Sequence, residues 1–216
     1  MKIKKLLHSC LLIEENDKNI LIDPGSWSFS AKGIKVSDVP KLDAIFITHS
    51  HGDHCSPEII KEFIARDSVP VYCNSDIANV LADKGVTTAS IAIPHTVEVA
   101  GFIVTSAEAP HGRLPWSTAI NNGFWINKRV FLPGDSHEFT LDTAPEVLVL
   151  PIAAPWGTAT RAIELALSLK PKHVIPCHDF VIDEDFREMM LTNVGKSLTP
   201  SGIEYHPLTP TDTLEI

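Results

Sequence analysis

The sequence predicts an α+β fold in which two β-sheets face each other and helices cover both outer faces. The chain has 216 residues, of which 44% are hydrophobic and 21% charged, so it can bury a substantial core. Several expected strands follow one another and are then succeeded by strands that alternate with helices, and the second half of the chain repeats this order. This order differs from the regular strand–helix alternation of a doubly wound parallel sheet, so two sheets are the better interpretation. No linker or charge block divides the chain, and we expect residues 1–216 to form a single domain.

Short apolar runs separated by turn residues predict the strands. The polar turn 15-ENDK-18 separates two such runs, and 127-NKR-129 separates two more. A continuous apolar run such as 44-AIFIT-48 indicates a buried strand. The expected strands cover residues 2–7, 10–14, 19–23, 44–48, 69–73, 87–91, 97–99, 102–106, 123–126, 130–132, 147–150 and 173–176.

The helices are indicated by their first and last residues. Ser56 can cap a helix, Pro57 suits the first helical position, and Glu58 complements the helix dipole. Gly85 would end a second helix that starts near residue 75. Two more helices are expected over about residues 158–169 and 184–196. For the tail, residues 185–216, we expect a role in the core or in an interface rather than as a lid.

Charge and cysteine content limit the classes of partner. The formal net charge of −9 argues against a broad nucleic-acid surface but leaves an anionic substrate open. The four cysteines, at positions 10, 55, 73 and 177, have no C-x-x-C spacing, which fits reduced thiols in a cytosol. No run approaches the ~20 apolar residues of a membrane span, and the first residues lack a signal-peptide pattern. We expect a cytoplasmic protein with a small-molecule substrate, without nucleic-acid or membrane partners; a homo-oligomer stays open.

The segment 47-ITHSHGDHCSP-57 places His49, His51, Asp53 and His54 directly after an apolar run. A surface loop seldom needs three imidazoles so close together. A divalent ion does need several neutral nitrogens and charged oxygens that converge on one point. The segment therefore indicates a metal site.

Three further ligand types each follow a later apolar strand within a few residues. His111 stands in 107-AEAPHGR-113, Asp135 in 131-FLPGDS-136 and His178 in 174-VIPCHDF-180. Such loops suit catalytic groups, because a rigid sheet fixes where its strand ends point. His95 competes with His111, but it precedes a strand and lacks the adjoining glycine. His173 competes with His178, but it lies at a strand entrance, where we expect it to be exposed to solvent.

These candidates comprise five histidines and two aspartates. One tetrahedral zinc ion needs only four ligands, whereas seven suit two ions that share a bridging carboxylate and a bridging water. Two ions about 3.5–4 Å apart lower the pKa of the bridging water and stabilise a developing oxyanion.

The order T-H-x-H-x-D-H, then H-G, then G-D and then a late histidine resembles the metallo-β-lactamase superfamily. The matching segments are 48-THSHGDH-54, 111-HG-112, 134-GD-135 and His178, and the resemblance covers about residues 1–180. Three segments look like its small metal-dependent hydrolase branch, which includes ascorbate-6-phosphate-lactonase-like proteins: 8-HSCLLIE-14, 20-ILIDPG-25 and 170-KPKHVIPCHDF-180.

The resemblance implies a four-layer αββα sandwich with metals at one edge of the sheets. Asp23 would lie beneath the metal loop and hold a ligand or the loop backbone. The expected cofactors are two divalent metal ions, with zinc as the first choice and Mn²⁺ or iron also compatible with the ligands. The resemblance assigns one ion to His49, His51 and His111, the second to Asp53, His54 and His178, and the bridging position to Asp135.

The resemblance further implies a metal-dependent hydrolase, in which a metal-bound hydroxide attacks a small ester, lactone or phosphoester. Asp53 would orient the hydroxide or carry its proton to the leaving group while it touches the second ion. The alternative is an iron-dependent redox enzyme on the same fold, with oxygen, nitric oxide or persulfide chemistry. Its di-iron branch has a glutamate in place of His51 and adds a flavin domain, and its mono-iron branch uses fewer ligands.

Other residues could contribute to the site without being ligands. Arg113, Trp116 and Trp156 fall in loops near expected ligands and could line a substrate pocket. His8 lies between two expected strands and could either reach the mouth of the site or be a buried structural histidine. His137 is interpreted as the exposed start of a helix.

Overall fold

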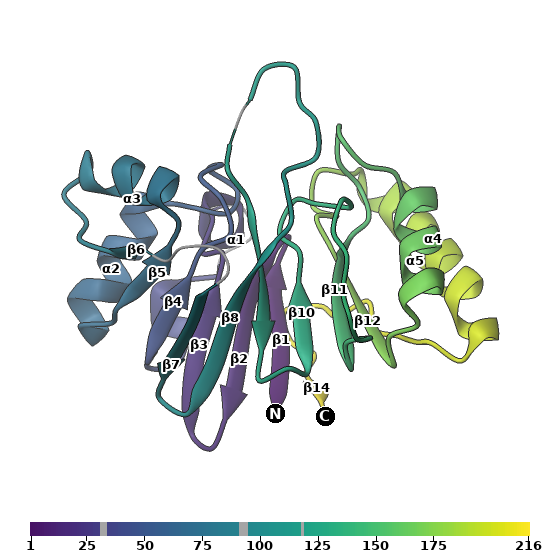
Figure 1. Cartoon of the computed structure of the whole chain (residues 1–216), viewed down its shortest axis with the longest axis horizontal. Coiled ribbons are helices and arrows are strands. Elements are labelled where there is room, and N and C mark those ends of the chain that lie inside the picture. The colour runs from purple at the N-terminus through teal and green to yellow at the C-terminus, as the bar shows by residue number, and fades with distance from the viewer. Residues whose placement is uncertain (31–33, 91–94, 118) are drawn as a thin grey trace.

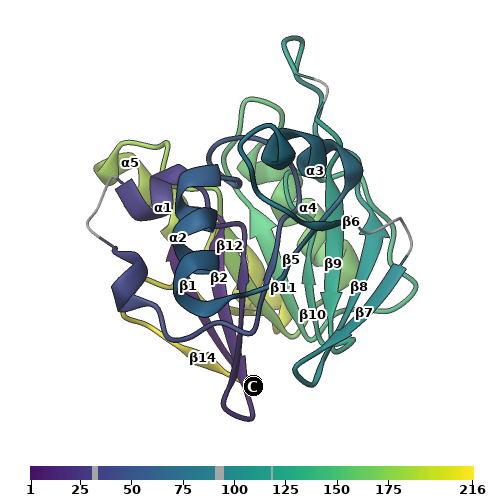
Figure 2. The same ribbon diagram turned by 90° about the vertical axis from the view of Figure 1, so that its left-hand side faces the viewer.

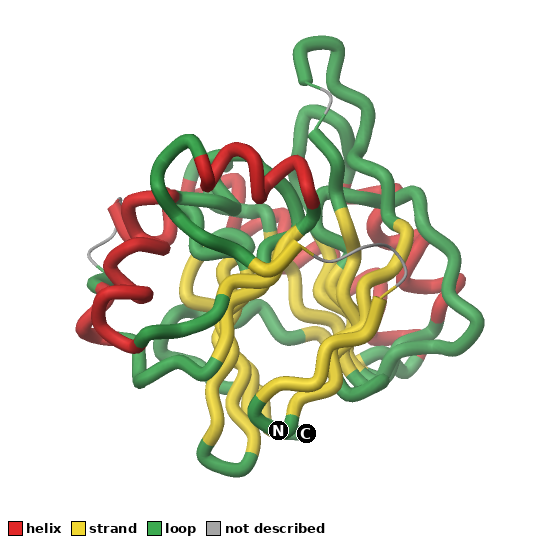
Figure 3. The backbone as a smooth tube through the Cα atoms, turned by 60° about the vertical axis from the view of Figure 1, so that its left-hand side comes forward, coloured by secondary structure: helices red, strands yellow, loops and turns green. Residues whose placement is uncertain are grey.

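Two seven-stranded sheets lie face to face in this protein (Figure 1). The computed structural model describes residues 1–30, 34–90, 95–117 and 119–216. Helices pack against the outer face of each sheet, so the layers are helix, sheet, sheet and helix (Figures 2 and 3). The predicted αββα sandwich is thereby confirmed. Within the described part of the chain, no helix has the length and apolar character needed to cross a membrane.

The first sheet is built mainly from the first half of the chain, with one strand from the C-terminal end. Its first three strands are antiparallel neighbours, and the rest of the first-half strands pair in parallel. Its strand order is β14-β1-β2-β3-β4-β5-β6. The elements are β1 (Lys2–Leu7), β2 (Cys10–Glu15), β3 (Lys18–Ile22), α1 (Ser26–Ser30), the 3-10 turn η1 (Val36–Asp38), β4 (Ala44–Phe46), α2 (Pro57–Asp67), β5 (Val71–Cys73), α3 (Ser75–Ala82), β6 (Ala89–Ser90) and β14 (Leu214–Glu215).

The second sheet repeats this plan with the second half of the chain. Four antiparallel strands are followed by strands that pair in parallel, in the order β13-β12-β11-β10-β9-β8-β7. The elements are β7 (His95–Val99), β8 (Phe102–Glu108), β9 (Asn122–Ile126), β10 (Val130–Leu132), β11 (Val147–Pro151), α4 (Ala159–Leu169), β12 (His173–Cys177), α5 (Glu184–Leu198), the 3-10 turn η2 (Thr199–Ser201) and β13 (Glu204–Tyr205).

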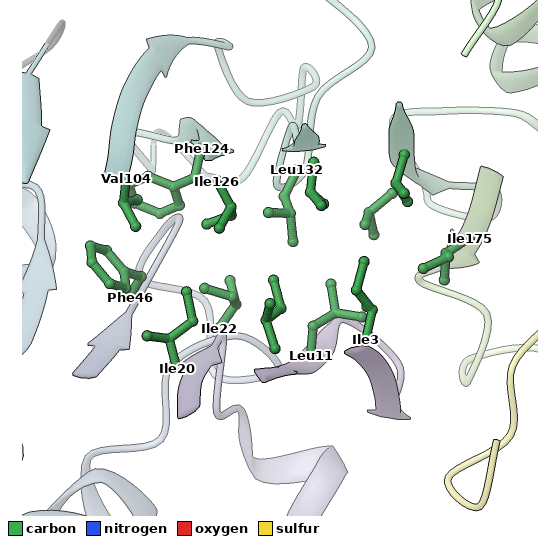
Figure 4. Close-up of a cluster of buried hydrophobic side chains, with 14 of the residues drawn as sticks. Ile3, Leu11, Ile20, Ile22, Phe46, Val104, Phe124, Ile126, Leu132 and Ile175 are labelled. Atoms are coloured by element: carbon green, nitrogen blue, oxygen red, sulfur yellow. The ribbon is translucent and has the colours of Figure 1, made fainter. Parts of the chain in front are cut away.

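Alternation along the strands divides the apolar side chains between an inner and two outer clusters. In β3, Ile20 and Ile22 face the opposite sheet, whereas Leu21 faces the helices. The inner cluster joins the two sheets, as the facing side chains in Figure 4 show. Because successive side chains of a strand point to opposite faces, a continuous apolar strand serves both layers. The buried strands thus explain why the sequence shows runs rather than alternation.

The helices bury one apolar face each on the outer side of a sheet. Ser56 caps α2 through its side chain, which accepts a hydrogen bond from the Ile59 amide, as predicted. In the tail, α5 buries Val194 and Leu198 in the cluster that α4 also contacts. The tail is therefore part of the core on this side, and its last strand, β14, pairs with β1 in the other sheet.

Most predicted elements agree with the structure to within a few residues. The expected strand over 87–91 is β6, with residue 91 outside the described part of the chain. The short elements α1, β13 and β14 were not predicted. Each contains five residues or fewer, too few for a hydrophobic period to develop, so only packing against longer elements reveals them.

Several strands end at the same edge of the sandwich. In Figure 1, β1 runs upward from the N-terminus, and β8 runs upward into the protruding loop. β8 and β10 are both antiparallel to β9, so they run in the same direction. Ligands in such folds bind at the carboxyl ends of strands, where loops from several strands meet. The candidate metal residues occupy this edge.

Candidate metal centre

The histidine loop after β4 is anchored from below by a buried aspartate. The Asp23 carboxylate accepts hydrogen bonds from the Thr48 amide and hydroxyl, both at 2.8 Å, and its Oδ2 lies 2.8 Å from His54 Nδ1. Its own amide donates to the Phe46 carbonyl at 3.0 Å. Asp23 was expected to hold a ligand or the loop backbone, and the structure shows that it holds both.

The same loop passes very close to the chain after β3. A Cβ built at Gly25 would lie 1.7 Å from the Asp53 carbonyl oxygen, so only glycine permits this approach. The Ser26 amide donates to the Gly52 carbonyl at 2.8 Å, which joins the two segments further. The close approach therefore sets the position of the Asp53 backbone.

We expect Gly25→Ala to lower the free energy of unfolding by about 1–3 kcal/mol, because the backbone of one segment must move. Denaturant unfolding would measure the change. Gly52→Ala is the matched control in the same loop, since a Cβ there meets nothing within 4 Å. Equal losses in the two variants would contradict the importance of the close approach.

Five histidines turn one ring nitrogen outward to a hydrogen-bond partner and the other inward. His54 Nδ1 is held by Asp23, as described above. His49 Nδ1 lies 3.1 Å from the Thr48 hydroxyl. Because that hydroxyl donates its proton to Asp23, it must accept from His49. In both neutral rings the inward Nε2 then carries the lone pair that a metal needs.

The later histidines follow the same rule with backbone partners. His111 Nδ1 lies 2.6 Å from the Gly112 carbonyl, and His178 Nδ1 lies 2.5 Å from the Ala153 carbonyl. A carbonyl can only accept, so both Nδ1 atoms donate and both Nε2 atoms carry lone pairs when the rings are neutral. His178 has a positive φ of 59°, so the backbone turns at the residue that immediately follows β12.

His51 is the one member of the five that presents Nδ1 inward. Its Nε2 lies 2.6 Å from the Ser117 hydroxyl, and its Nδ1 lies 3.2 Å from His111 Nε2. Ser117 belongs to the loop between β8 and β9, which residue patterns alone did not connect with His51. The contact thus ties the first histidine loop to the one that carries His111.

The carboxylate of Asp135 lies between the histidines. Its Oδ1 is 3.1 Å from His54 Nε2, and its Oδ2 is 3.1 Å from His178 Nε2. Oδ2 is also 3.8 Å from His49 Nε2 and 3.7 Å from His111 Nε2. The seven predicted residues are therefore brought together, with Asp135 central.

Two groups form around this carboxylate, and in each the candidate ligand atoms lie within 4.8 Å of one another. One comprises His49, His51, His111 and Asp135, and the other comprises His8, Asp53, His54 and His178. Apart from His8, the division matches the one that the resemblance implies.

Some of the inward atoms are buried without satisfying their hydrogen-bonding capacity. His49 Nε2, His54 Nε2 and Asp135 Oδ1 are buried without a hydrogen-bond partner. The 3.1 Å contact between His54 Nε2 and Asp135 Oδ1 therefore lacks hydrogen-bond geometry. Buried polar atoms without partners are costly and rare. Converging nitrogen lone pairs and carboxylate oxygens are a donor set that fits a divalent cation.

Electrostatics favour the protonation states that bind cations at two of these residues. Burial lowers the pKa of His49 well below its usual value, and the neighbouring His54 contributes. Burial alone would raise the pKa of Asp135, but His54 and His178 hold it well below the usual range. Burial also opposes protonation of His54, yet Asp135 and Asp23 outweigh it and raise its pKa. A bound cation would replace a proton there.

His8 belongs to the site and is fully buried, which the sequence left open. Its Nε2 lies 3.1 Å from Asp53 Oδ2, and burial lowers its pKa to about 4. Burial opposes ionisation of Asp53, but the hydrogen bond from His8 and the charge on His54 bring the Asp53 pKa below its usual value. A neutral His8 thus donates to an ionised Asp53 and orients its carboxylate.

Two further side chains hold Asp135, and one of them was missed in the sequence. Trp156 Nε1 donates to Asp135 Oδ2 at 3.1 Å, so this residue contacts a candidate ligand directly. Buried Asn121 accepts from the Asp135 amide at 3.1 Å and donates to the Ala109 and Pro133 carbonyls. Asn121 thereby joins the loops that carry His111 and Asp135, and no sequence motif indicated it.

The other pocket candidates lie on the protruding loop. Arg113 lines a cavity of about 550 Å³ together with His111 and Ser117. Trp116 is 72% exposed and is absent from the lining of this cavity. Arg113 is thus placed beside the site, whereas Trp116 lies in contact with solvent.

Neither histidine that competed for a ligand position, His95 or His173, belongs to the two groups around Asp135. The expected exposure of His173 and of His137 was wrong. His95 is exposed on β7 and belongs to neither group. His173 was expected to be exposed but is buried, and its ring packs against that of His206, which follows the neighbouring strand β13. His137 was interpreted as the exposed start of a helix. It is instead buried in a loop, where its Nε2 donates to the Pro151 carbonyl at 2.8 Å.

The four cysteines are free and buried. Burial raises the pKa of Cys55 to about 12, so this thiol stays protonated beside the histidine loop. For Cys177, which adjoins His178, burial likewise raises the pKa well above its usual value. Neither cysteine belongs to the two groups of candidate ligands.

Comparisons with known proteins agree with this architecture. A family model described as a beta-lactamase superfamily domain matches residues 2–178. A metal-dependent hydrolase of Archaeoglobus fulgidus is 30% identical over 200 residues, covering 82% of this chain and 83% of that protein.

Solved structures share the fold at lower identity. The structure of a metallo hydrolase from Ignicoccus hospitalis has a TM-score of 0.76 at 21% identity and covers 100% of this chain and 98% of its own. The diiron β-hydroxylase CmlA of Streptomyces venezuelae also has a TM-score of 0.76, at 14% identity, with 54% of its own chain covered. From the family match and the hydrolase relative, the chain belongs to the metallo-β-lactamase superfamily and, within it, to a family of metal-dependent hydrolases.

Proposed function

We propose that this protein hydrolyses a small ester, lactone or phosphoester with two divalent metal ions. His49, His51 and His111 would hold one ion, Asp53, His54 and His178 the other, and Asp135 would bridge them. The observation that supports this most is the orientation of the five histidines. Each directs one nitrogen toward the Asp135 carboxylate region while an outer partner holds the other nitrogen.

Bound divalent ions supply Lewis acidity: they lower the pKa of a water molecule and stabilise negative charge that develops on oxygen. The protein's own contribution is to hold the ligands rigidly. Asp23 fixes His54 and the Thr48 backbone, and Trp156 and Asn121 fix Asp135. Preorganised ligands of this kind need little rearrangement during the reaction.

Asp53 is proposed as the general acid–base group. Its side chain is 15% exposed, so it can reach both the site and the solvent. His8 keeps Oδ2 oriented, and Oδ2 also lies 3.6 Å from His178 Nε2. An ionised carboxylate in this place can accept a proton from the attacking water and deliver it to the leaving group.

The cavity beside His111 supports a small substrate that carries negative charge. It measures about 550 Å³, within the range of small-molecule pockets. Arg113 and Glu108 both line it, and the Arg113 guanidinium can pair with a carboxylate or phosphate group of the substrate. Lactones and phosphoesters of small acids combine such a group with a hydrolysable bond.

Metal content per chain tests the proposal first, by elemental analysis of protein purified without added metal or chelator. We expect at least two ions of zinc or manganese per chain, because the candidate ligands around Asp135 form two groups. Chelation should abolish ester or phosphoester hydrolysis, and restored metal should return it. About one iron per chain with oxygen consumption would instead favour redox chemistry. Failure of reloaded protein to retain ions would contradict the proposed ligand set.

A further inference from the structure

A third cluster of metal-ligating side chains lies away from the candidate metal centre. It comprises His173, Glu204 and His206. His173 begins β12, whereas His178 follows the other end of that strand. At about 3.3 Å per residue, the two histidines are on the order of 16 Å apart along the strand. The cluster is therefore separate from the centre described above.

Strand pairing places the three side chains on one face of the sheet. His173 lies opposite Glu204 in the parallel pair of β12 and β13. The His206 amide donates to the Val174 carbonyl at 2.9 Å, which continues the pairing beyond β13. Glu204 and His206 are two residues apart, so their side chains share a face, while Tyr205 between them packs against the outer cluster.

The ligand atoms have the spacing of a metal face. His173 Nδ1 is 3.1 Å from His206 Nε2 and 3.4 Å from Glu204 Oε2, and the last two atoms are 3.9 Å apart. Zinc binds such nitrogens and oxygens at about 2.0–2.2 Å, so tetrahedral ligand atoms lie about 3.4 Å from one another. The three observed distances bracket this value.

Exposure leaves room for a further ligand on the solvent side. The side chain of His173 is 7% exposed, that of His206 is 24% exposed and that of Glu204 is 59% exposed. An ion there would have a buried nitrogen on one side and a carboxylate toward solvent on the other. A water molecule could complete four-fold coordination.

We propose that His173, Glu204 and His206 form a structural site for a zinc-like divalent cation. The ion would cross-link β12 to the chain that follows the edge strand β13. Edge strands with short ladders are held weakly, and β13 contains only two residues. A cation bound to the folded state alone would stabilise this part of the protein. The opposing interpretation is a hydrogen-bonded histidine pair with a nearby carboxylate and no ion.

Zinc stoichiometry of the full-length protein distinguishes the two interpretations. Protein is equilibrated with zinc, freed of excess ion and analysed for metal per chain. We expect His206→Ala to hold one ion fewer per chain than the wild type. Glu204→Gln should also lose this ion, although it keeps hydrogen-bonding capacity. His95→Ala is the matched control, because His95 is an exposed histidine outside every cluster.

The comparison does not depend on the proposed catalytic function. If the centre around Asp135 does not retain zinc, the zinc content per chain falls equally in the wild type and in the variants. The site at His173, Glu204 and His206 is measured only by the difference in zinc content between the wild type and the variants. A second readout is thermal unfolding, in which added zinc should raise the Tm of the wild type more than that of His206→Ala. Equal zinc content in the wild type, His206→Ala and Glu204→Gln would overturn the proposal.

Discussion

Asp135→Asn is expected to lower turnover more than about 100-fold and to reduce the bound metal at both positions. The carboxylate is 3.1 Å from inward nitrogens of both His54 and His178 and 3.7–3.8 Å from those of His111 and His49. Asparagine keeps the volume but loses the charge and one oxygen ligand. Loss of an outer partner of a metal ligand already costs about 10–100-fold, so loss of a shared ligand should cost more.

Steady-state hydrolysis and elemental analysis of the same preparation would measure this effect. Asp142→Asn is the control, because Asp142 is an exposed aspartate outside the ligand groups. Circular dichroism should show the fold retained, since the core lies between and outside the sheets rather than at their edge. An Asp135→Asn protein with full metal content and turnover would refute the bridging role.

Asp53→Asn is expected to lower kcat by about 10²–10⁴-fold, the usual contribution of a general acid–base group. Unlike Asp135, Asp53 lies at one side of the site, with Oδ2 3.1 Å from His8 Nε2 and 3.6 Å from His178 Nε2. The ion assigned to His49, His51 and His111 should therefore stay bound in Asp53→Asn. The loss of turnover should exceed the loss of metal, which metal analysis and kinetics on the same samples can compare.

A double-mutant comparison tests whether His8 acts through Asp53. We expect His8→Ala alone to lower kcat by about tenfold or more, because Asp53 loses the donor that orients it. In the Asp53→Asn background, the same change should have little further effect. Equal effects of His8→Ala in both backgrounds would show that His8 contributes independently of Asp53.

Much of the fold and of the candidate ligand set could be predicted from the sequence. The apolar runs of β3, β4 and β11 are continuous because both faces of each strand are buried, and this pattern is local. The segment with His49, His51, Asp53 and His54 was also readable, since its residues are adjacent in the chain. His111, Asp135 and His178 could be added because each follows an apolar strand.

Residues whose role depends on a distant partner were missed or misjudged. Asn121 and Ser117 look like ordinary loop residues, and only their contacts with Asp135 and His51 reveal a role. His173 was expected to be exposed because it lies at a strand entrance, and its local position gives no sign of the distant residues that contact it. Its partners, Glu204 and His206, are about 30 residues away and meet it only through parallel strand pairing.

The sequence alone determined the fold class, the αββα layering and the residue types available to bind metal, because these follow from local patterns of burial and spacing. Tertiary structure decided which nitrogen of each histidine turns inward, that His8 joins Asp53, and that β12 and β13 assemble a third cluster. Those features depend on where separate strand ends meet in space. Strand pairing and packing across the whole chain set that arrangement, and no local segment encodes it.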